Sequence, residues 1–179
     1  KLSDTQTISF GANDYYKFGV TVQPVGQVYK LVESKASINT SDRYVLANEN
    51  TVNPGGDLAS SKVLGKYDTS VSTTYIQGVN IIAKTSTGKK IVVNEQEVTP
   101  FKISTETIDK VSGYVLKDLS NNYFGKSTSE KNGLVIGSPA FKLWVIDDIT
   151  SGGFVQIKNK QDNYVIKYNT SALGFSTYT

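Results

Sequence analysis

The sequence contains no cysteine and no histidine among its 179 residues. Without cysteine, the chain can form no disulfide and no thiolate metal site, and it has no thiol nucleophile. Without histidine, it lacks the usual general base, a common metal ligand and the side chain that titrates near neutral pH. These absences remove most familiar catalytic centres, so we expect a protein that is not an enzyme and that carries no cofactor and no metal.

Carboxylates offer little in place of the missing residues. Asp147 and Asp148 are adjacent, and neighbouring residues of a strand point to opposite faces, so this pair cannot share a proton as a catalytic dyad does. Glu95 and Glu97 can share a face, but the sequence offers them no recognisable catalytic partner. The expectation that the protein is not an enzyme therefore stands.

Methionine and long apolar runs are also absent. No stretch approaches the roughly 18 apolar residues of a membrane helix, so we expect no membrane insertion. The chain begins at Lys1, which suggests a processed product or an excised domain, from which a signal peptide could have been removed. The net charge is +3 and the lysines are scattered rather than clustered, so no nucleic-acid partner is expected.

The residues that are abundant favour β-structure. Tyrosine, threonine, valine and isoleucine are plentiful, glycine marks many turns, and no long segment has helical apolar spacing. A chain of this length, 38% hydrophobic, can bury one good core. We therefore predict a single all-β domain over residues 27–179.

An internal repeat runs through the second half of the chain. Four pairs of similar residues lie forty positions apart: Phe101 and Phe141, Lys102 and Lys142, Gly113 and Gly153, Tyr114 and Phe154. A looser copy lies earlier in the chain, where Tyr29 corresponds to Phe101 and Tyr44 corresponds to Tyr114. In that copy Thr69–Lys89 is predicted to be an insertion that bulges out between strands, which costs little loop entropy.

Three units of four short strands predict a β-trefoil, with units at about 27–100, 101–140 and 141–179. A β-sandwich or another closed barrel is the alternative. In the trefoil, Phe101, Phe141 and Tyr29 occupy equivalent buried positions near a pseudo-three-fold axis. Trp144 then points the other way, either as a cap of the barrel or as an exposed contact residue.

Residues 1–26 lie outside the three units. Thr7–Phe10 and Tyr15–Val22 look like strands, and Pro24–Gly26 is a break before the first unit. This segment is predicted to be an N-terminal β arm or extra hairpin, which packs on its own barrel or joins a neighbour.

Two predicted hairpin tips, residues 118–123 and 159–164, occupy equivalent places in successive units and could bind sugar. Sugar sites combine an aromatic platform with amide and carboxylate side chains that bond hydroxyl groups. The simpler explanation is that asparagine and aspartate are favoured turn residues. The candidate ligand-binding residues are Asp118, Asn121, Asn122, Tyr123, Asp162, Asn163, Tyr164 and Trp144.

The pattern of Phe141–Trp144, Gly153–Asn159 and Asp162–Ile166 resembles the rhythm of ricin-type β-trefoils, although the Gln-x-Trp signature is absent. Arg43–Asn48, Gly113–Asp118 and Lys167–Tyr178 are similar to poorly characterised β domains of secreted and surface proteins of Bacteroidetes. Gly174 stands where those domains commonly have arginine. The resemblance implies an extracellular or cell-surface setting and an accessory role, or a place on the virion surface of a phage that infects such hosts.

We therefore expect a non-catalytic extracellular or surface binding or adhesion module whose partner is a glycan or a protein. The alternative is a structural subunit of an assembly, such as a phage capsid-decorating or fibre protein or a pilus-like component. Residues 1–26 or 69–89 could make the contacts in such an assembly.

Overall fold

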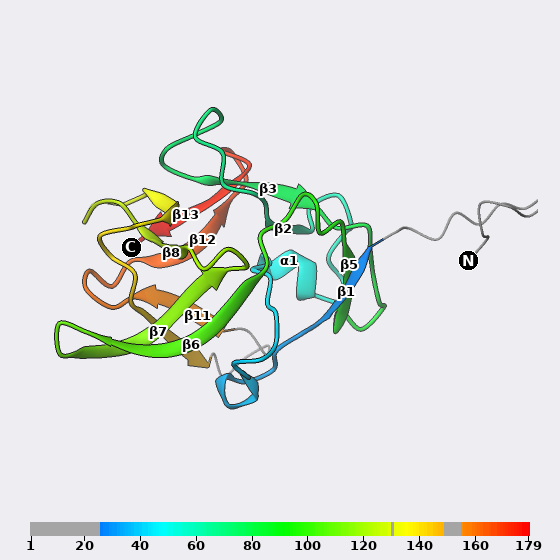
Figure 1. Cartoon of the computed structure of the whole chain (residues 1–179). Coiled ribbons are helices and arrows are strands. Elements are labelled where there is room, and N and C mark those ends of the chain that lie inside the picture. Colours follow the sequence, from blue (N-terminus) through cyan, green and yellow to red (C-terminus); the bar gives the residue numbers. More distant parts are fainter. Residues whose placement is uncertain (1–25, 130, 149–154) are drawn as a thin grey trace, which may run out of the picture.

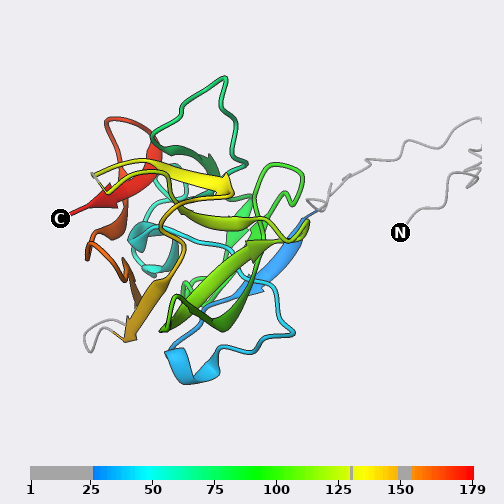
Figure 2. The same ribbon diagram turned by 60° about the vertical axis from the view of Figure 1, so that its left-hand side comes forward.

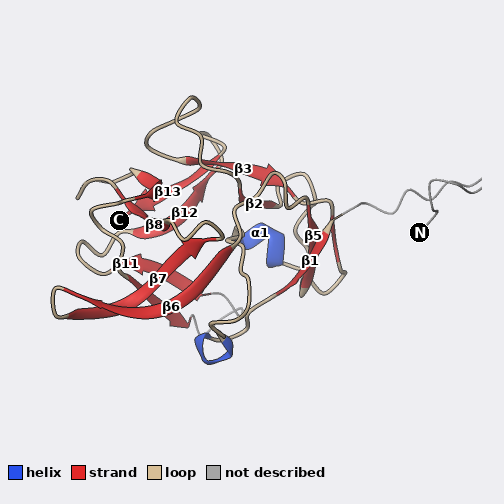
Figure 3. Cartoon of the chain, viewed as in Figure 1, coloured by secondary structure: helices blue, strands red, loops and turns tan. Residues whose placement is uncertain are grey.

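The structure is a computed structural model that describes residues 26–129, 131–148 and 155–179. Strands account for 46% of it and helices for 4%, which confirms the all-β class (Figure 3). The helical elements are a 3-10 turn at Lys35–Ser37 and α1 at Glu49–Val52. The predicted arm lies outside the described residues except for Gly26.

The strands are short and follow one another along the whole described chain. They are β1 (Gln27–Lys30), β2 (Lys62–Leu64), β3 (Ile76–Asn80), β4 (Ala83–Lys84), β5 (Lys90–Val93), β6 (Phe101–Ile108), β7 (Val111–Asp118), β8 (Tyr123–Lys126), β9 (Leu134–Gly137), β10 (Trp144–Asp148), β11 (Val155–Asn159), β12 (Val165–Asn169) and β13 (Gly174–Tyr178).

The strands form two antiparallel sheets, and the small one, on the right of Figure 1, lies next to β2 and β3 of the large one. The small sheet has the order β1-β5-β4. The large sheet has the order β2-β3-β13-β12-β11-β10-β7-β8-β9, with β6 paired to β7. It curls on itself (Figure 2), and the Asn132 N–H before β9 donates to the Thr177 carbonyl of β13 at 2.9 Å.

The β6–β7 hairpin shows how the sequence sets the local structure. Its two-residue turn, Asp109 and Lys110, has positive φ angles of 52° and 67°, as primed hairpin turns require. The register then places Phe101 opposite Asp118 and Ile103 opposite Leu116. Phe101 and Ile103 point inward and are buried, so period-two alternation holds along this strand.

Three aromatic rings form the centre of the main core. The Phe124 ring centroid lies 5.0 Å from that of Phe101 and 5.4 Å from that of Trp144. All three side chains are fully buried. A second, smaller cluster of Val63, Ile81, Ile91, Val93 and Val98 lies under the small sheet.

The forty-residue register is wrong around Trp144. Phe101 makes a backbone bridge to Tyr44 and also pairs with Asp118 across its hairpin. In the next copy these two roles are separated. Phe141 makes the bridge, to Lys126, whereas Trp144 pairs across the hairpin with Asn159.

The three-residue displacement puts Trp144, and not Phe141, in the hairpin place that Phe101 occupies in the preceding copy. Trp144 is therefore fully buried, and the prediction that it could be an exposed contact residue is wrong. Phe141 is only half-buried, and Tyr29 packs against the second cluster rather than beside Phe101. These three aromatic residues are thus not the equivalent set that the repeat predicted.

The prediction that Thr69–Lys89 bulges out is also wrong. Its middle forms β3, which pairs with β2 on one side and with β13 on the other. Ile76 of β3 is buried in the main core. Within this segment, most exposed residues lie in the turns around β3 and β4, and Gln77 and Asn80 of β3 are exposed as well.

Candidate functional site

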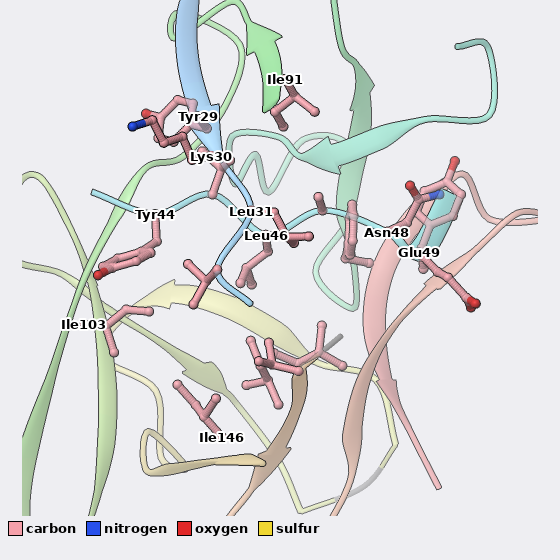
Figure 4. Close-up of a pocket in the computed structure, with 18 of the residues that line it drawn as sticks. Tyr29, Lys30, Leu31, Tyr44, Leu46, Asn48, Glu49, Ile91, Ile103 and Ile146 are labelled. Carbon is pink, nitrogen blue, oxygen red and sulfur yellow. The ribbon is translucent and has the colours of Figure 1, made fainter. Parts of the chain in front are cut away.

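A large cavity lies between residues 27–50 and the curled large sheet (Figure 4). Its volume is about 1570 Å³, above the 300–1,000 Å³ or so of a typical small-molecule site. Leu31 and Leu46 lie in its middle, with Tyr29 and Ile91 on one side and Ile103 and Ile146 on the other.

Both aliphatic and charged side chains line the cavity. The residues that line it include Leu31, Leu46, Ile103, Ile157 and Ile166. The lining also includes cationic and anionic side chains, namely Lys30, Arg43, Lys89 and Lys167, and Asp42, Glu49 and Glu95. The site therefore favours a ligand with apolar groups and without a strong net charge of either sign.

Two tyrosines lie in the cavity wall. The Tyr29 hydroxyl donates to Glu95 Oε1 at 2.8 Å, and burial, together with this carboxylate, raises the pKa of Tyr29 above its ordinary value. Burial also raises the pKa of Tyr168. The buried Tyr168 hydroxyl has no hydrogen-bond partner among the described residues. Both phenols therefore stay neutral at physiological pH.

Strand β1 supplies one wall of the cavity and is the outer strand of its sheet. Among the described residues it pairs only with β5. The Leu31 N–H donates to the Lys89 carbonyl on the β5 side at 2.8 Å. Because backbone groups alternate along an antiparallel strand, those of Val28 and Lys30 face the other, free edge.

The first predicted sugar site is held together by its own turn. Asp118 Oδ1 accepts from the backbone N–H groups of Ser120 and Asn122, at 2.9 and 2.8 Å. Asn121 has a positive φ of 67°, a conformation that asparagine tolerates in turns. These contacts agree with the simpler explanation, namely that aspartate and asparagine stand here because they stabilise the turn.

The Tyr123 ring of that tip is already in contact with cations. The Nζ atoms of Lys117 and Lys142 lie 4.3 and 4.7 Å from its centroid. Its hydroxyl donates to Glu106 Oε2 at 2.8 Å, and Glu106 Oε1 is 2.7 Å from Lys117 Nζ. Contact with Lys117 is the main cause of a lowered pKa at Glu106.

The second tip is tied to the core. Asp162 forms an ion pair with Lys126, whose side chain is completely buried. The Lys126 Nζ lies 4.2 Å from the Tyr164 ring centroid, and the Tyr164 N–H donates to Asp162 Oδ1 at 3.1 Å. Asn163 has a positive φ of 64°. The structure thus brings Asp162 and Tyr164 together around a buried ammonium group.

The two tips are not equivalent, contrary to the sequence prediction. Lys117 pairs with Tyr123, whereas Lys158 pairs with Val165. Val165, and not Tyr164, therefore takes the place of Tyr123, because the second turn is one residue longer. Trp144 is buried and donates its Nε1–H to the Phe124 carbonyl at 3.0 Å, so it presents no surface at either tip.

Sequence reasoning missed the cavity because strands far apart in the chain build it. The sequence predicted that Tyr29 lies in the core beside Phe101, but in the structure Tyr29 and Leu31 line the cavity. Nothing local in the sequence shows that the surface they face is open. The pairing of β1 with β5 and the curl of the large sheet create it.

Comparison with known proteins finds no matching family model, no similar curated protein and no similar solved structure. Within the described ranges, no helix is long and apolar enough to cross a membrane. The same residues contain no group of three or more acidic side chains placed to hold a metal ion.

Proposed function

We propose that this protein is a non-catalytic binding module that accepts an extended, partly apolar polypeptide strand. The observation that carries the proposal is the cavity of about 1570 Å³ with its aliphatic lining, next to the free edge of β1. A strand can pair its backbone with such an edge while its alternate side chains enter the pockets beside it.

The lining favours a polypeptide over a glycan. Sugar sites depend on exposed aromatic platforms, whereas the centre of this cavity is formed by Leu31, Leu46 and isoleucines. At the two tips, the Tyr123 and Tyr164 rings are in contact with lysine ammonium groups. A glycan partner remains the second candidate, since Asn121 and Asn163 at the two tips are exposed.

The finer architecture that we propose is a β-trefoil. Support comes from the successive hairpins β6–β7 and β10–β11 and from the two similar backbone bridges, Tyr44 to Phe101 and Lys126 to Phe141. We further propose an extracellular or cell-surface location. Its support is the resemblance of Arg43–Asn48, Gly113–Asp118 and Lys167–Tyr178 to surface domains of Bacteroidetes.

The test uses a fluorescent peptide of about ten residues, the length of a long strand, in which valine or phenylalanine alternates with threonine or lysine. Fluorescence anisotropy is expected to show saturable binding to the full-length protein. A peptide of the same composition with its apolar residues at helical spacing is the control, and it should bind more weakly.

A substitution in the cavity provides the second arm of this test. Leu31→Asn places an amide in the lining without touching either core cluster, and it should weaken peptide binding about tenfold or more. Leu119→Asn is the matched control, because Leu119 is exposed on a hairpin tip. Equal binding by both peptides, or saturable binding on a glycan array with none to the peptide, would reject the polypeptide ligand.

A further inference from the structure

We infer that the loop of residues 48–61 contains a site for an ammonium-type cation, which the side chain of Lys84 fills, and that this contact holds one wall of the cavity in place. The cation site is argued from its own contacts. Its effect on the cavity wall rests on the proposed function, because the binding of a peptide measures it.

The Lys84 ammonium group has the full set of hydrogen-bond acceptors that a bound cation of this kind needs. Its Nζ donates to the backbone carbonyls of Asn50 and Asn53, at 3.0 and 3.2 Å, and to Ser61 Oγ at 3.2 Å. A lysine ammonium group has three N–H donors and no acceptor. The three oxygen atoms therefore match it one to one.

The oxygen atoms around Lys84 are neutral, since two belong to backbone carbonyls and one to a hydroxyl. Among the ion pairs of the described residues, none includes Lys84. Asp57, a carboxylate of the same loop, accepts instead from the Ser60 N–H at 2.9 Å. Converging carbonyl oxygens can replace the hydration shell of a monovalent cation. The arrangement is thus a cation site whose cation belongs to the chain itself.

The loop presents these oxygen atoms because of its own structure. Asn48 is the N-cap of α1, and its Oδ1 accepts from the Thr51 N–H at 3.1 Å. The last carbonyls of a helix have no partner within it, and in this short helix the Asn50 carbonyl is one of them. The Ser61 hydroxyl donates to the Asp57 carbonyl at 2.7 Å, so its lone pairs remain to accept from the ammonium group.

Lys84 reaches the loop from a different element. It belongs to β4, the outer strand of the small sheet, and pairs with Ile91 of β5. Its side chain is half-buried, and its ammonium group contacts a carbonyl 34 residues earlier in the chain. The contact therefore ties the loop to the small sheet.

The tied part of the loop is also a wall of the cavity. Asn50 and Asn53 are among the lining residues, together with Asn48 and Glu49 (Figure 4), whereas Lys84 is not. The helix in this wall has only 4 residues, and helices shorter than about 12 residues are marginal without tertiary contacts. Lys84 is therefore a positioning residue, which fixes the wall without touching a ligand.

Two full-length variants test the inference. Lys84→Ala removes the ammonium group and leaves space for a small cation, whereas Lys84→Met removes the charge but keeps a long side chain in that space. Each variant should lower the urea midpoint of unfolding. Each should also bind the fluorescent alternating peptide about tenfold more weakly, as expected for the loss of hydrogen bonds to a charged group.

Rescue by added cations is the decisive step. Ammonium or methylammonium chloride should restore the midpoint and the peptide affinity of Lys84→Ala, but not those of Lys84→Met. Tetramethylammonium chloride at the same concentration carries the same charge without an N–H donor, so it should restore neither. Lys90→Ala is the matched control, because Lys90 is exposed on β5 and lies outside the cavity lining; it should behave like the unmodified chain.

The two readouts separate failure of this inference from failure of the proposed function. If ammonium restores the midpoint of Lys84→Ala but the unmodified chain does not bind the peptide, the cation site stands and the proposed function is wrong. Equal responses to ammonium and tetramethylammonium would overturn the cation site. A Lys84→Ala variant that binds the peptide as tightly as the unmodified chain would rule out the positioning role.

Discussion

Lys126 is a charged residue that the fold places completely inside the molecule. Its ammonium group is matched by the Asp162 carboxylate and by the face of the Tyr164 ring. A buried charge without a partner costs several kcal/mol. Lys126 therefore needs these contacts to be stable in its buried position. They also explain why the second tip carries an aspartate and a tyrosine without invoking a ligand.

Asp162→Asn is expected to lower the free energy of unfolding by about 3–5 kcal/mol, because it leaves the ammonium group buried without a carboxylate. The amide still offers an oxygen to the Tyr164 N–H. Asp147→Asn is the control; Asp147 is 44% exposed and 3.7 Å from Lys158, and its loss should cost less than about 1 kcal/mol. Urea denaturation measures both, and equal losses would contradict a structural role for Lys126.

Glu106 should contribute to the acid sensitivity of the protein. Its pKa is lowered in the folded state from an ordinary value of 4.5, chiefly by the hydrogen bond with Lys117. The stabilisation is therefore complete above pH 4.5 and is lost as the pH falls through the lowered folded pKa.

In Glu106→Gln the loss of stability below pH 4.5 should be smaller than in the unmodified protein. Denaturation at neutral pH and at two acid pH values gives the comparison. An unchanged pH dependence would show that the Lys117 contact does not persist in solution.

The three-residue offset between the Phe141 bridge and the start of β10 decides which aromatic residue enters the core. Phe141 keeps the backbone bridge, and Trp144 takes the buried place opposite Asn159. The repeat is therefore better preserved in the backbone bridges than in the side chains.

Trp144→Ala and Phe101→Ala should each cost about 3–5 kcal/mol of unfolding free energy, as expected for cavities left by large buried rings. Phe141→Ala should cost less, below about 2 kcal/mol, because that ring is half-buried. Chemical denaturation of the three variants tests this order. A loss at Phe141 equal to that at Phe101 would restore the simple forty-residue register.

Lys102 and Lys142, which follow Phe101 and Phe141 in the sequence, are predicted to contribute less to stability than the aromatic residues. Lys102→Ala is expected to change stability by less than about 0.5 kcal/mol. Lys142→Ala removes the contact with the Tyr123 ring, which is worth about 0.5–1 kcal/mol at an exposed site.

At the scale of the whole molecule, two hydrophobic clusters are joined by one short strand. Val63 of β2 belongs to the cluster under the small sheet, and its neighbour Leu64 belongs to the main core. Since successive residues of a strand face opposite sides, β2 lies between both clusters. Strand β3 extends this link to β13.

We expect the two clusters to unfold together in a single transition. Trp144 fluorescence reports on the main core, and far-UV circular dichroism reports on all strands. The two signals should therefore give the same denaturation midpoint, as in two-state unfolding. A separate earlier transition in the circular dichroism would show that the small sheet unfolds independently.

The sequence alone determined the all-β class and the local turn chemistry. Period-two alternation and the positions of glycine, asparagine and aspartate act over a few residues, so they can be read without the fold. The inward Phe101 and the Asp118 turn were predicted in this way, and the structure has both where they were expected.

Only the tertiary structure decided the face of Trp144, the place of β3 and the existence of the cavity. The face of a side chain depends on whether the backbone pairing shifts by an odd or an even number of residues, which the partner strand sets. The cavity depends on how β1 and the curled sheet approach each other across much of the chain. These are long-range relations between backbones, and no local pattern in the sequence specifies them.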